Sequence, residues 1–416
     1  MKHVTDLAIF GGTPAFTEKL HVGRPNIGNR EKLLERINDM LDRRWLTNNG
    51  PFVQELERKI EARLGVKHCV LMCNGTIALE ILARAVGLKG EVIVPSFTFV
   101  ATPHSLQWQE ITPVFCDIDP ATHTLDPRRV EELITPRTTG ILAVHLWSRP
   151  CDIDALTAIA KKRNLKLIFD ASHAFDCSYG SRMIGNFGDA EVFSFHGTKF
   201  FNTLEGGAVT TNDDALAKKL RLMKNFGFAG YDDVIYIGTN GKMNEMCAAM
   251  GLVGLDDLSH FITTNQRNYE SYQRYLRGLP GVSLLPYSEV NRSNYQYVVL
   301  EIDESLSGIH RDYLLELLHA ENVIARRYFY PGCHRMEPYR SYFPHAGLLL
   351  PETDKMAQRV LVLPTGTAVS DEHIKAICNV LRQGIENAAA IKERWSTRNQ
   401  AALQRHAEPP AIPAAR

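Results

Sequence analysis

Two short segments carry side chains whose types suit covalent and electrostatic chemistry. Lys199 lies in the loop that follows an apolar, strand-like segment, and a lysine held at the edge of a sheet can form a Schiff base with a carbonyl carbon. Asp170 ends the apolar run 167–169, where its carboxylate could sit beside the ring nitrogen of a bound cofactor. Taken singly, each has an ordinary interpretation, because loop lysines are mostly solvated charges and strand-end aspartates mostly form caps or turns.

Two further segments could hold the other parts of a flat, phosphorylated cofactor. Gly75 and Thr76 follow Asn74 where a strand meets a helix, and free N–H groups at a helix N-terminus attract phosphate. Phe99 follows another strand and could stack on a ring, although such aromatics are more often core residues. Neither G-x-G-x-x-G nor a Walker motif occurs. The order of the four features along successive strands favours pyridoxal phosphate chemistry, in which a protonated ring withdraws electrons.

The elements that must position these residues follow from the apolar pattern. Short β-branched runs such as 91–96, 141–146 and 165–170 alternate with helical stretches such as 76–86 and 153–163, which predicts a mostly parallel sheet with helices on both faces. Such α/β sheets bind ligands at the carboxyl ends of their strands. The pattern changes after residue 212 and indicates a smaller C-terminal α+β domain. We expect an N-terminal arm at 1–30, a large domain at 31–260, a small domain at 261–390 and a helical to disordered tail at 391–416.

Composition excludes several classes of protein. The 416 residues carry 47 basic and 47 acidic side chains, which argues against a general nucleic-acid binder. No apolar run is long enough for a membrane span, and the N-terminus does not read as a secretory signal. The eight cysteines match no zinc module, so we expect no metal and reduced thiols in a cytoplasmic protein.

The motifs together resemble the DegT/DnrJ/EryC1/StrS sugar aminotransferases, a family of fold-type I pyridoxal-phosphate enzymes. The resemblance covers residues from about 26 to about 383. Within the family the chain is most similar to the members that make dTDP-4-amino-4,6-dideoxyglucose. The motifs that carry it are WLTNNGP at 45–51, NGT at 74–76, SFHGTK at 194–199, FNTLEGG at 201–207 and KNFGF at 224–228.

The resemblance implies a role for each matching residue. Lys199 would bond to pyridoxal 5'-phosphate and then move protons, and Asp170 would pair with the pyridinium nitrogen. A homodimer with shared active sites is implied as well, together with a nucleotide sugar and L-glutamate as substrates. The other implied contacts are Gly75, Thr76 and Ser194 at the phosphate, Phe99 and His173 at the ring, Asn240 at the partner's phosphate, and Thr47 and His334 at the sugar.

The resemblance also implies a reaction, for which alternatives stay open. We expect transfer of an amino group from L-glutamate to C4 of dTDP-4-dehydro-6-deoxyglucose. The segments 147–150 and 331–334 and the longer Asn48–Asn49 stretch depart from the commoner family pattern, and the last two lie near the expected sugar pocket. The same chemistry on a 3-keto dTDP-sugar, a UDP-linked 4-keto sugar or a keto-inositol is therefore an alternative. Lys199 disfavours the C3-dehydratase branch, and a non-catalytic regulator on the same scaffold is the alternative from another class.

Overall fold

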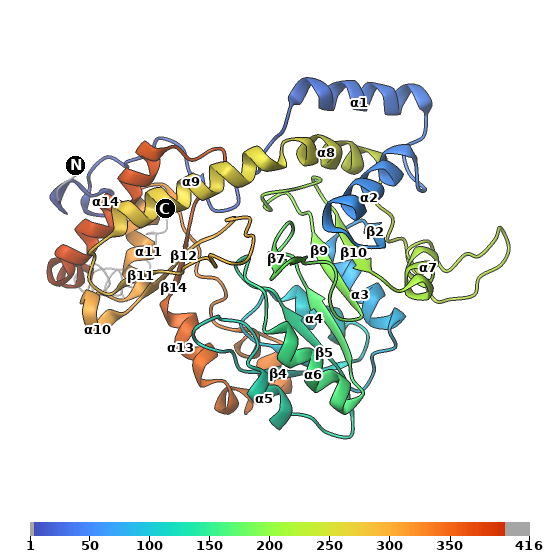
Figure 1. The fold of residues 1–416 in the computed structure, drawn as a ribbon. Coiled ribbons are helices and arrows are strands. Elements are labelled where there is room, and N and C mark those ends of the chain that lie inside the picture. The colour runs from blue at the N-terminus through green and yellow to red at the C-terminus, as the bar shows by residue number, and fades with distance from the viewer. Residues whose placement is uncertain (1–3, 396–416) are drawn as a thin grey trace, which may run out of the picture.

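A seven-stranded sheet lies at the centre of the larger part of the molecule in this computed structural model, which describes residues 4–395 (Figure 1). The strand order is β2-β10-β9-β6-β5-β3-β4. Every neighbouring pair is parallel except those that β10 makes with β2 and β9. The strands are β2 (His68–Met72), β3 (Glu91–Pro95), β4 (Thr112–Cys116), β5 (Thr138–Val144), β6 (Lys166–Asp170), β9 (Ala190–Ser194) and β10 (Gly207–Thr211).

Both faces of this sheet are buried, as the continuous apolar runs predict. Alternate residues of β6 enter different cores, since Phe169 packs on one face and Ile168 on the other. Helices α3, α4 and α7 contribute to the second core, and α2, α6 and α8 to the first. The bounds are α1 (Arg30–Arg43), α2 (Pro51–Leu64), α3 (Gly75–Ala85), α4 (Ala101–Gln107), α5 (Pro127–Glu132), α6 (Ile153–Arg163), α7 (Asp214–Met223) and α8 (Glu245–Asp256).

A second, antiparallel sheet organises the smaller part of the molecule. Its order is β11-β12-β14, and it has its own core with helices α9, α11 and α14. The two-stranded pairs β1 with β13 and β7 with β8 lie outside both sheets. The remaining bounds are β1 (Leu20–His21), β7 (Ser178–Tyr179), β8 (Arg182–Met183), α9 (Leu258–Leu276), β11 (Val282–Leu284), β12 (Val298–Ile302), α10 (Glu304–Ser307), α11 (Arg311–Ala320), β13 (Val323–Ile324), α12 (Tyr339–Tyr342), α13 (Pro351–Arg359), β14 (Val360–Leu363) and α14 (Asp371–Glu386).

The arrangement agrees with the predicted architecture and refines its details. The large mostly parallel sheet and the smaller α+β part are as expected, whereas the antiparallel β10 was not anticipated. Helix α7 ends at Met223, because Phe226 and Gly227 adopt positive φ and the Gly227 N–H caps the carbonyl of Leu222 at 2.8 Å.

The expected domain limits stay a prediction. Helix α9 runs through the expected boundary at 260/261 and joins the two parts (Figure 1). The residues at 388–395 are helical, and the rest of the predicted tail lies outside the described residues. Within residues 4–395, no helix combines the length and the apolar character that a bilayer crossing requires.

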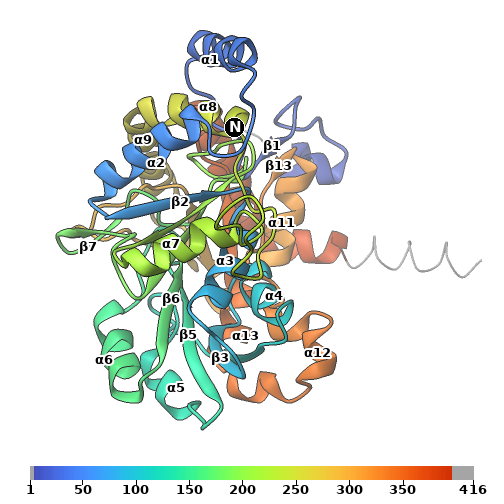
Figure 2. The ribbon, with the colours of Figure 1, turned by 90° about the vertical axis from the view of Figure 1, so that its right-hand side faces the viewer.

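The N-terminal arm contacts both parts of the molecule. Glu321 accepts hydrogen bonds from the backbone N–H groups of Ala8 and Ala15, and β1 pairs in parallel with β13. The Asn26 side chain then donates to the carbonyl of Phe200 at 2.9 Å in the large part. The arm is therefore attached to both parts. Figure 2 shows α1, which follows the arm, at the upper end of the molecule, where it packs on α8.

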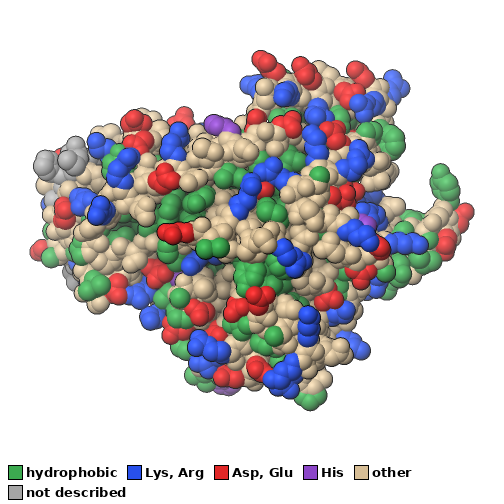
Figure 3. Space-filling model, in the orientation of Figure 1, with side chains coloured by type: hydrophobic (Ala, Val, Ile, Leu, Met, Phe, Trp, Pro, Cys, Tyr) green, Lys and Arg blue, Asp and Glu red, His purple; other side chains and the backbone are tan. Residues whose placement is uncertain are grey.

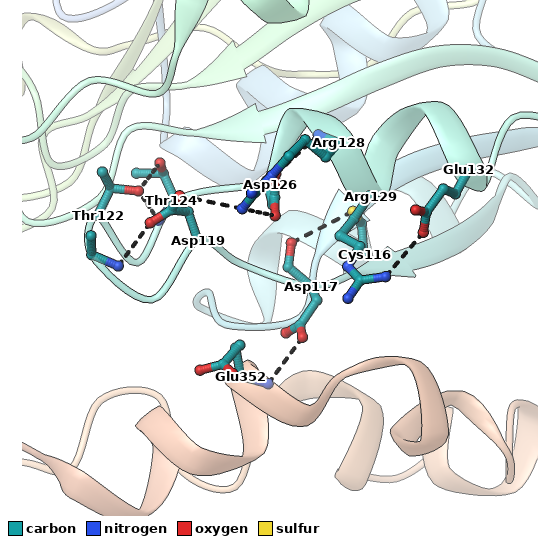
Figure 4. Close-up of polar contacts among 11 residues, drawn as sticks. Cys116, Asp117, Asp119, Thr122, Thr124, Asp126, Arg128, Arg129, Glu132 and Glu352 are labelled. Atoms are coloured by element: carbon teal, nitrogen blue, oxygen red, sulfur yellow. Dashed lines mark hydrogen bonds and ion pairs between the residues drawn. The ribbon is translucent and has the colours of Figure 1, made fainter.

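Asp117 makes a second connection between the two parts (Figure 4). Its buried carboxylate follows β4 and accepts hydrogen bonds from the backbone N–H of Glu352 at 2.9 Å and of Thr353 at 2.8 Å. The Thr353 hydroxyl donates a third bond at 2.8 Å. Because both N–H groups belong to the first turn of α13, Asp117 caps that helix from a distant segment.

Replacing Asp117 by alanine should destabilise the fold. We expect the Asp117→Ala variant to lose about 2 kcal/mol of unfolding free energy, since buried donors are left without an acceptor. Asp119→Ala is the matched control, because the half-exposed Asp119 carboxylate accepts a local bond from Ala121, and we expect a loss below about 1 kcal/mol. Urea unfolding measures both variants, and equal losses would contradict this role for Asp117.

Candidate active site

A cavity of about 790 Å³ lies at the carboxyl ends of the central strands. It is lined by the loops after β2, β3, β6 and β9, by the N-terminal arm and by the segments around Tyr297 and Tyr328 of the smaller part. Position at this edge is what a parallel α/β sheet predicts for a ligand site. Seven of the ten residues singled out from the sequence line the cavity: Gly75, Thr76, Phe99, Asp170, His173, Ser194 and Lys199.

The N-terminus of α3 forms one end of the cavity. The Asn74 side chain caps the helix by accepting a hydrogen bond from the Ile77 N–H at 2.8 Å. The N–H groups of Gly75 and Thr76 belong to the first turn, which has no intrahelical acceptors. A Cβ on Gly75 would come within 3.0 Å of the Ser194 Cβ, so glycine lets the end of β9 approach the helix. The helix terminus and the Ser194 hydroxyl together make a site for an anion.

Asp170 is a buried carboxylate with defined partners. Its Oδ2 accepts a hydrogen bond from the Thr102 hydroxyl at 2.9 Å, and its Oδ1 accepts one from the Ser172 N–H at 3.0 Å. The Thr98 hydroxyl lies 3.1 Å from that of Thr102 and extends the network. These contacts fix the orientation of the carboxylate at the cavity, where it can stabilise a protonated nitrogen.

Lys199 places its amine in the same cavity. Burial lowers the pKa of this amine to about 8, and the negative charge of Asp170 opposes that change. The amine donates a long hydrogen bond of 3.5 Å to the hydroxyl of Tyr297. With this pKa about a tenth of the amine is neutral at pH 7, far more than for an ordinary lysine, and the neutral amine is the nucleophilic and proton-accepting form.

His173 belongs to an aromatic cluster beneath the cavity. Its ring lies 4.4 Å from that of Tyr297 and stacks on Trp147 at 5.8 Å, measured between ring centroids. Burial, helped by the charge of Lys199, lowers the pKa of His173 well below its usual value. His173 is therefore neutral, and Nδ1 accepts a weak bond of 3.5 Å from the Trp147 N–H, which leaves Nε2 as the donor.

Phe99 differs from the other aromatic residues of the site. It lines the cavity, yet 59% of its surface is exposed. An aromatic face that is held at a cavity without covering neighbours is available to stack on a planar ligand.

Three of the singled-out residues do not line this cavity. Asn240 lies in the long loop after α7, where it forms a bridge with Asn225, and Thr47 is exposed between α1 and α2. His334 is buried, with Nδ1 2.7 Å from the Ser96 hydroxyl and Nε2 3.2 Å from the Asp354 carboxylate. The His334 side chain therefore contacts Ser96 and Asp354 and does not line the cavity. The roles expected for Asn240, Thr47 and His334 stay predictions.

Several cavity residues were missed by sequence reasoning. Tyr297 faces Lys199, and its own N–H and carbonyl both bond the hydroxyl of Tyr287, at 3.3 Å and 2.7 Å. The chain just before His334 contributes Tyr328 and Phe329 to the lining, whereas His334 itself does not line the cavity. Arg24 and Arg326 are two further polar residues of the lining that were missed. They come from distant parts of the chain, and no local motif marks them.

Comparison with known proteins places this site in a family. Residues 28–382 match the model of the DegT/DnrJ/EryC1/StrS aminotransferase family. The chain is 38% identical over 366 residues to dTDP-4-amino-4,6-dideoxy-D-glucose transaminase of Shigella dysenteriae, over 88% of this chain and 98% of that protein. It is 34% identical over 326 residues to GDP-perosamine synthase of Caulobacter vibrioides, over 77% of this chain and 87% of that protein.

A solved structure agrees with the fold throughout. The crystal structure of DesI in the presence of its TDP-sugar product matches with a TM-score of 0.91 and 49% identity, over 94% of this chain and all of that one. The fold class predicted from the sequence is confirmed. On the family match and these identities, the chain belongs to the DegT/DnrJ/EryC1/StrS aminotransferase family.

Proposed function

We propose that this protein uses pyridoxal 5'-phosphate to move an amino group from L-glutamate to C4 of dTDP-4-dehydro-6-deoxyglucose, giving dTDP-4-amino-4,6-dideoxyglucose. The observation that carries the proposal is the amine of Lys199, buried in a cavity beside Asp170 with a pKa of about 8. The Shigella dysenteriae relative and the TDP-sugar in the DesI structure support this choice of substrate.

The residues of the cavity suit the separate groups of pyridoxal phosphate. The N-terminus of α3 with Ser194 suits the phosphate, and Phe99 offers a free aromatic face for the ring. Asp170 suits the pyridinium nitrogen, and the Nε2 donor of His173 suits the ring hydroxyl. When bound, this cofactor supplies an electron-withdrawing ring that stabilises negative charge on the adjacent carbon.

The chain's own residues would orient the reactants and move protons. Asp170 presents its carboxylate to the cavity in a fixed orientation, because the Thr102 hydroxyl and the Ser172 N–H both donate to it. Lys199 takes a proton as the neutral amine and returns it as the ammonium, which a pKa near working pH allows in both directions. Tyr297 holds the Lys199 amine through its hydroxyl and limits the positions the amine can reach.

Other sugar nucleotides remain alternatives for the same chemistry. The Caulobacter vibrioides relative is named for a GDP-linked sugar, at slightly lower identity than the Shigella dysenteriae relative. The chemistry at Lys199 is independent of the nucleotide, so the product structure distinguishes these candidates. A non-catalytic regulator is disfavoured, because nothing in that role needs a buried amine with a pKa of about 8.

We further propose a homodimer in which Asn240 reaches the phosphate site of the partner subunit. The loop that carries Asn240 projects from the body after α7 and bears apolar side chains (Figures 1 and 3). Ile237 is 75% exposed and Tyr231 is fully exposed. Exposed apolar residues gathered on one projection indicate a surface that another chain covers. The cytoplasmic location expected from the sequence stays a prediction.

Replacing Lys199 should abolish transamination. We expect the Lys199→Ala variant to fold and to lose at least about 10³-fold in rate, since no other amine lines the cavity in residues 4–395. Lys166→Ala is the control, because Lys166 forms only an exposed ion pair with Asp189 at 2.9 Å. The rate of amino-sugar formation from L-glutamate measures both, and near-normal turnover by Lys199→Ala would refute the assignment.

The pKa of Lys199 can be measured without cofactor or substrate. Trace acetylation of the apo-protein across pH 6–11, read by mass spectrometry of the Lys199 peptide, should give a midpoint near pH 8. The Asp170→Asn variant should shift this midpoint to lower pH, because the lost negative charge no longer stabilises the ammonium. A midpoint near 10.4, the ordinary lysine value, would contradict the buried environment.

Sharing of the sites can be tested by mixing two inactive subunits. A heterodimer of an Asn240→Ala subunit and a Lys199→Ala subunit has one site with both residues intact if Asn240 acts across the interface. We expect activity to return in heterodimers purified with two different tags. The recovered rate should be at most half that of the wild-type dimer, because only one of the two sites is intact. Heterodimers that form and stay inactive would count against the shared site.

A further inference from the structure

Arg24 and Arg326 bring two guanidinium groups without carboxylate partners to the active-site cavity. Both line the cavity and both are exposed. Within residues 4–395, neither forms an ion pair, and the Arg326 guanidinium lies 5.2 Å from the centre of the Tyr328 ring. The next residue behaves differently, since Arg327 pairs with Asp312 at 3.1 Å. What distinguishes Arg24 and Arg326 from other exposed arginines is that both line one cavity.

The backbone brings these two arginines to the same place and holds them there. In the parallel pairing of β1 with β13, His21 lies opposite Ile324, and Arg24 and Arg326 follow within three residues. Arg326 exchanges backbone hydrogen bonds with Val362 of β14, at 3.0 Å and 2.8 Å. Asn26 anchors the other segment, because its side chain accepts from the Thr367 N–H at 2.9 Å. Both guanidinium groups therefore extend from fixed backbone.

The carboxylates of the same cavity do not neutralise this pair. Asp170 is occupied by Thr102 and Ser172, and Glu205 lies 3.5 Å from His196. Guanidinium groups bind carboxylates and phosphates through two parallel hydrogen bonds, so the unpaired groups select for an anionic ligand. Both substrates of the proposed reaction are anions, and both must occupy this cavity in turn.

We propose that Arg24 and Arg326 form an anion clamp that holds the carboxylates of the amino donor in one half-reaction and the diphosphate of the nucleotide sugar in the other. This inference rests on the proposed function. It assigns substrate recognition to the N-terminal arm and the smaller part of the molecule, whereas cofactor binding belongs to the large sheet. The clamp also favours dicarboxylic amino donors over uncharged ones.

Two measurements on the purified protein test the clamp. The first is calorimetric binding of dTDP, a probe that carries the diphosphate without a sugar and involves no reaction. We expect Arg326→Ala and Arg24→Ala to weaken this binding about 10- to 100-fold each, which is the usual effect of losing charge-assisted hydrogen bonds. The dTDP affinity of Arg326→Lys should lie between those of the wild type and Arg326→Ala, because lysine keeps the positive charge and loses the two parallel N–H donors of the guanidinium. Raising the NaCl concentration should weaken dTDP binding more in the wild type than in Arg326→Ala.

The second measurement is the change in cofactor absorbance when the holoenzyme meets L-glutamate or L-alanine without sugar. Arg326→Ala should slow the reaction with L-glutamate about 10- to 100-fold and affect L-alanine less, so that the preference for glutamate shrinks. Arg267→Ala is the matched control, because Arg267 is an exposed arginine of α9 outside the cavity. Circular dichroism checks that each variant is folded.

The outcomes separate the two proposals. A wild-type protein that neither binds dTDP nor responds to L-glutamate would overturn the proposed function together with the clamp. A responsive wild type whose Arg24 and Arg326 variants match Arg267→Ala would overturn only the clamp. If the Arg24 and Arg326 variants changed only dTDP binding, or only the reaction with L-glutamate, the shared role of the two arginines would be overturned.

Discussion

The close approach of three backbone segments where β2, β10 and β9 lie side by side is the constraint on which the site depends. A Cβ on Gly207 would lie 2.6 Å from the carbonyl carbon of Asn74, and one on Gly75 would lie 3.0 Å from the Ser194 Cβ. These contacts let β10 insert between β2 and β9 while the start of α3 rests on the end of β9. A side chain at either glycine would separate the helix N-terminus from Ser194 and open the anion site. The position of Lys199, five residues after Ser194, depends on the same junction.

The chemistry of the site follows from what is buried beside this junction. Moving a lysine amine out of water costs free energy in its charged form, which is why burial lowers the pKa of Lys199 to about 8. Asp170 limits that change and is itself held by two donors. The aromatic cluster around His173 and Tyr297 excludes water from one side of the amine. A nucleophile, a fixed anion and a neutral histidine donor can therefore coexist within one cavity.

The sequence alone predicts the parts of the site that local pattern determines. Asp170, Ser194 and Lys199 each follow a strand, and Gly75 begins a capped helix, so parallel-sheet geometry alone brings them to one edge. Pairings between distant segments leave no such signal. The antiparallel β10 depends on its neighbours in space, and the β1–β13 pairing brings Arg24 and Arg326 to the same cavity. His334 resembles a substrate contact in sequence, yet in the structure Ser96 and Asp354 hold it outside the cavity lining. Ser96 lies 238 residues earlier in the chain, and Asp354 lies in another helix, α13, so no local pattern reveals either partner.

The most direct test of the central claim is the structure of the product. The purified protein would be incubated with pyridoxal phosphate, L-glutamate and dTDP-4-dehydro-6-deoxyglucose, and the sugar analysed by mass spectrometry and NMR. The account predicts an equatorial amine at C4 and an equal amount of 2-oxoglutarate. A cofactor that loses its absorbance with L-glutamate while the sugar stays unchanged would contradict this acceptor, and no response to either substrate would contradict the aminotransferase itself.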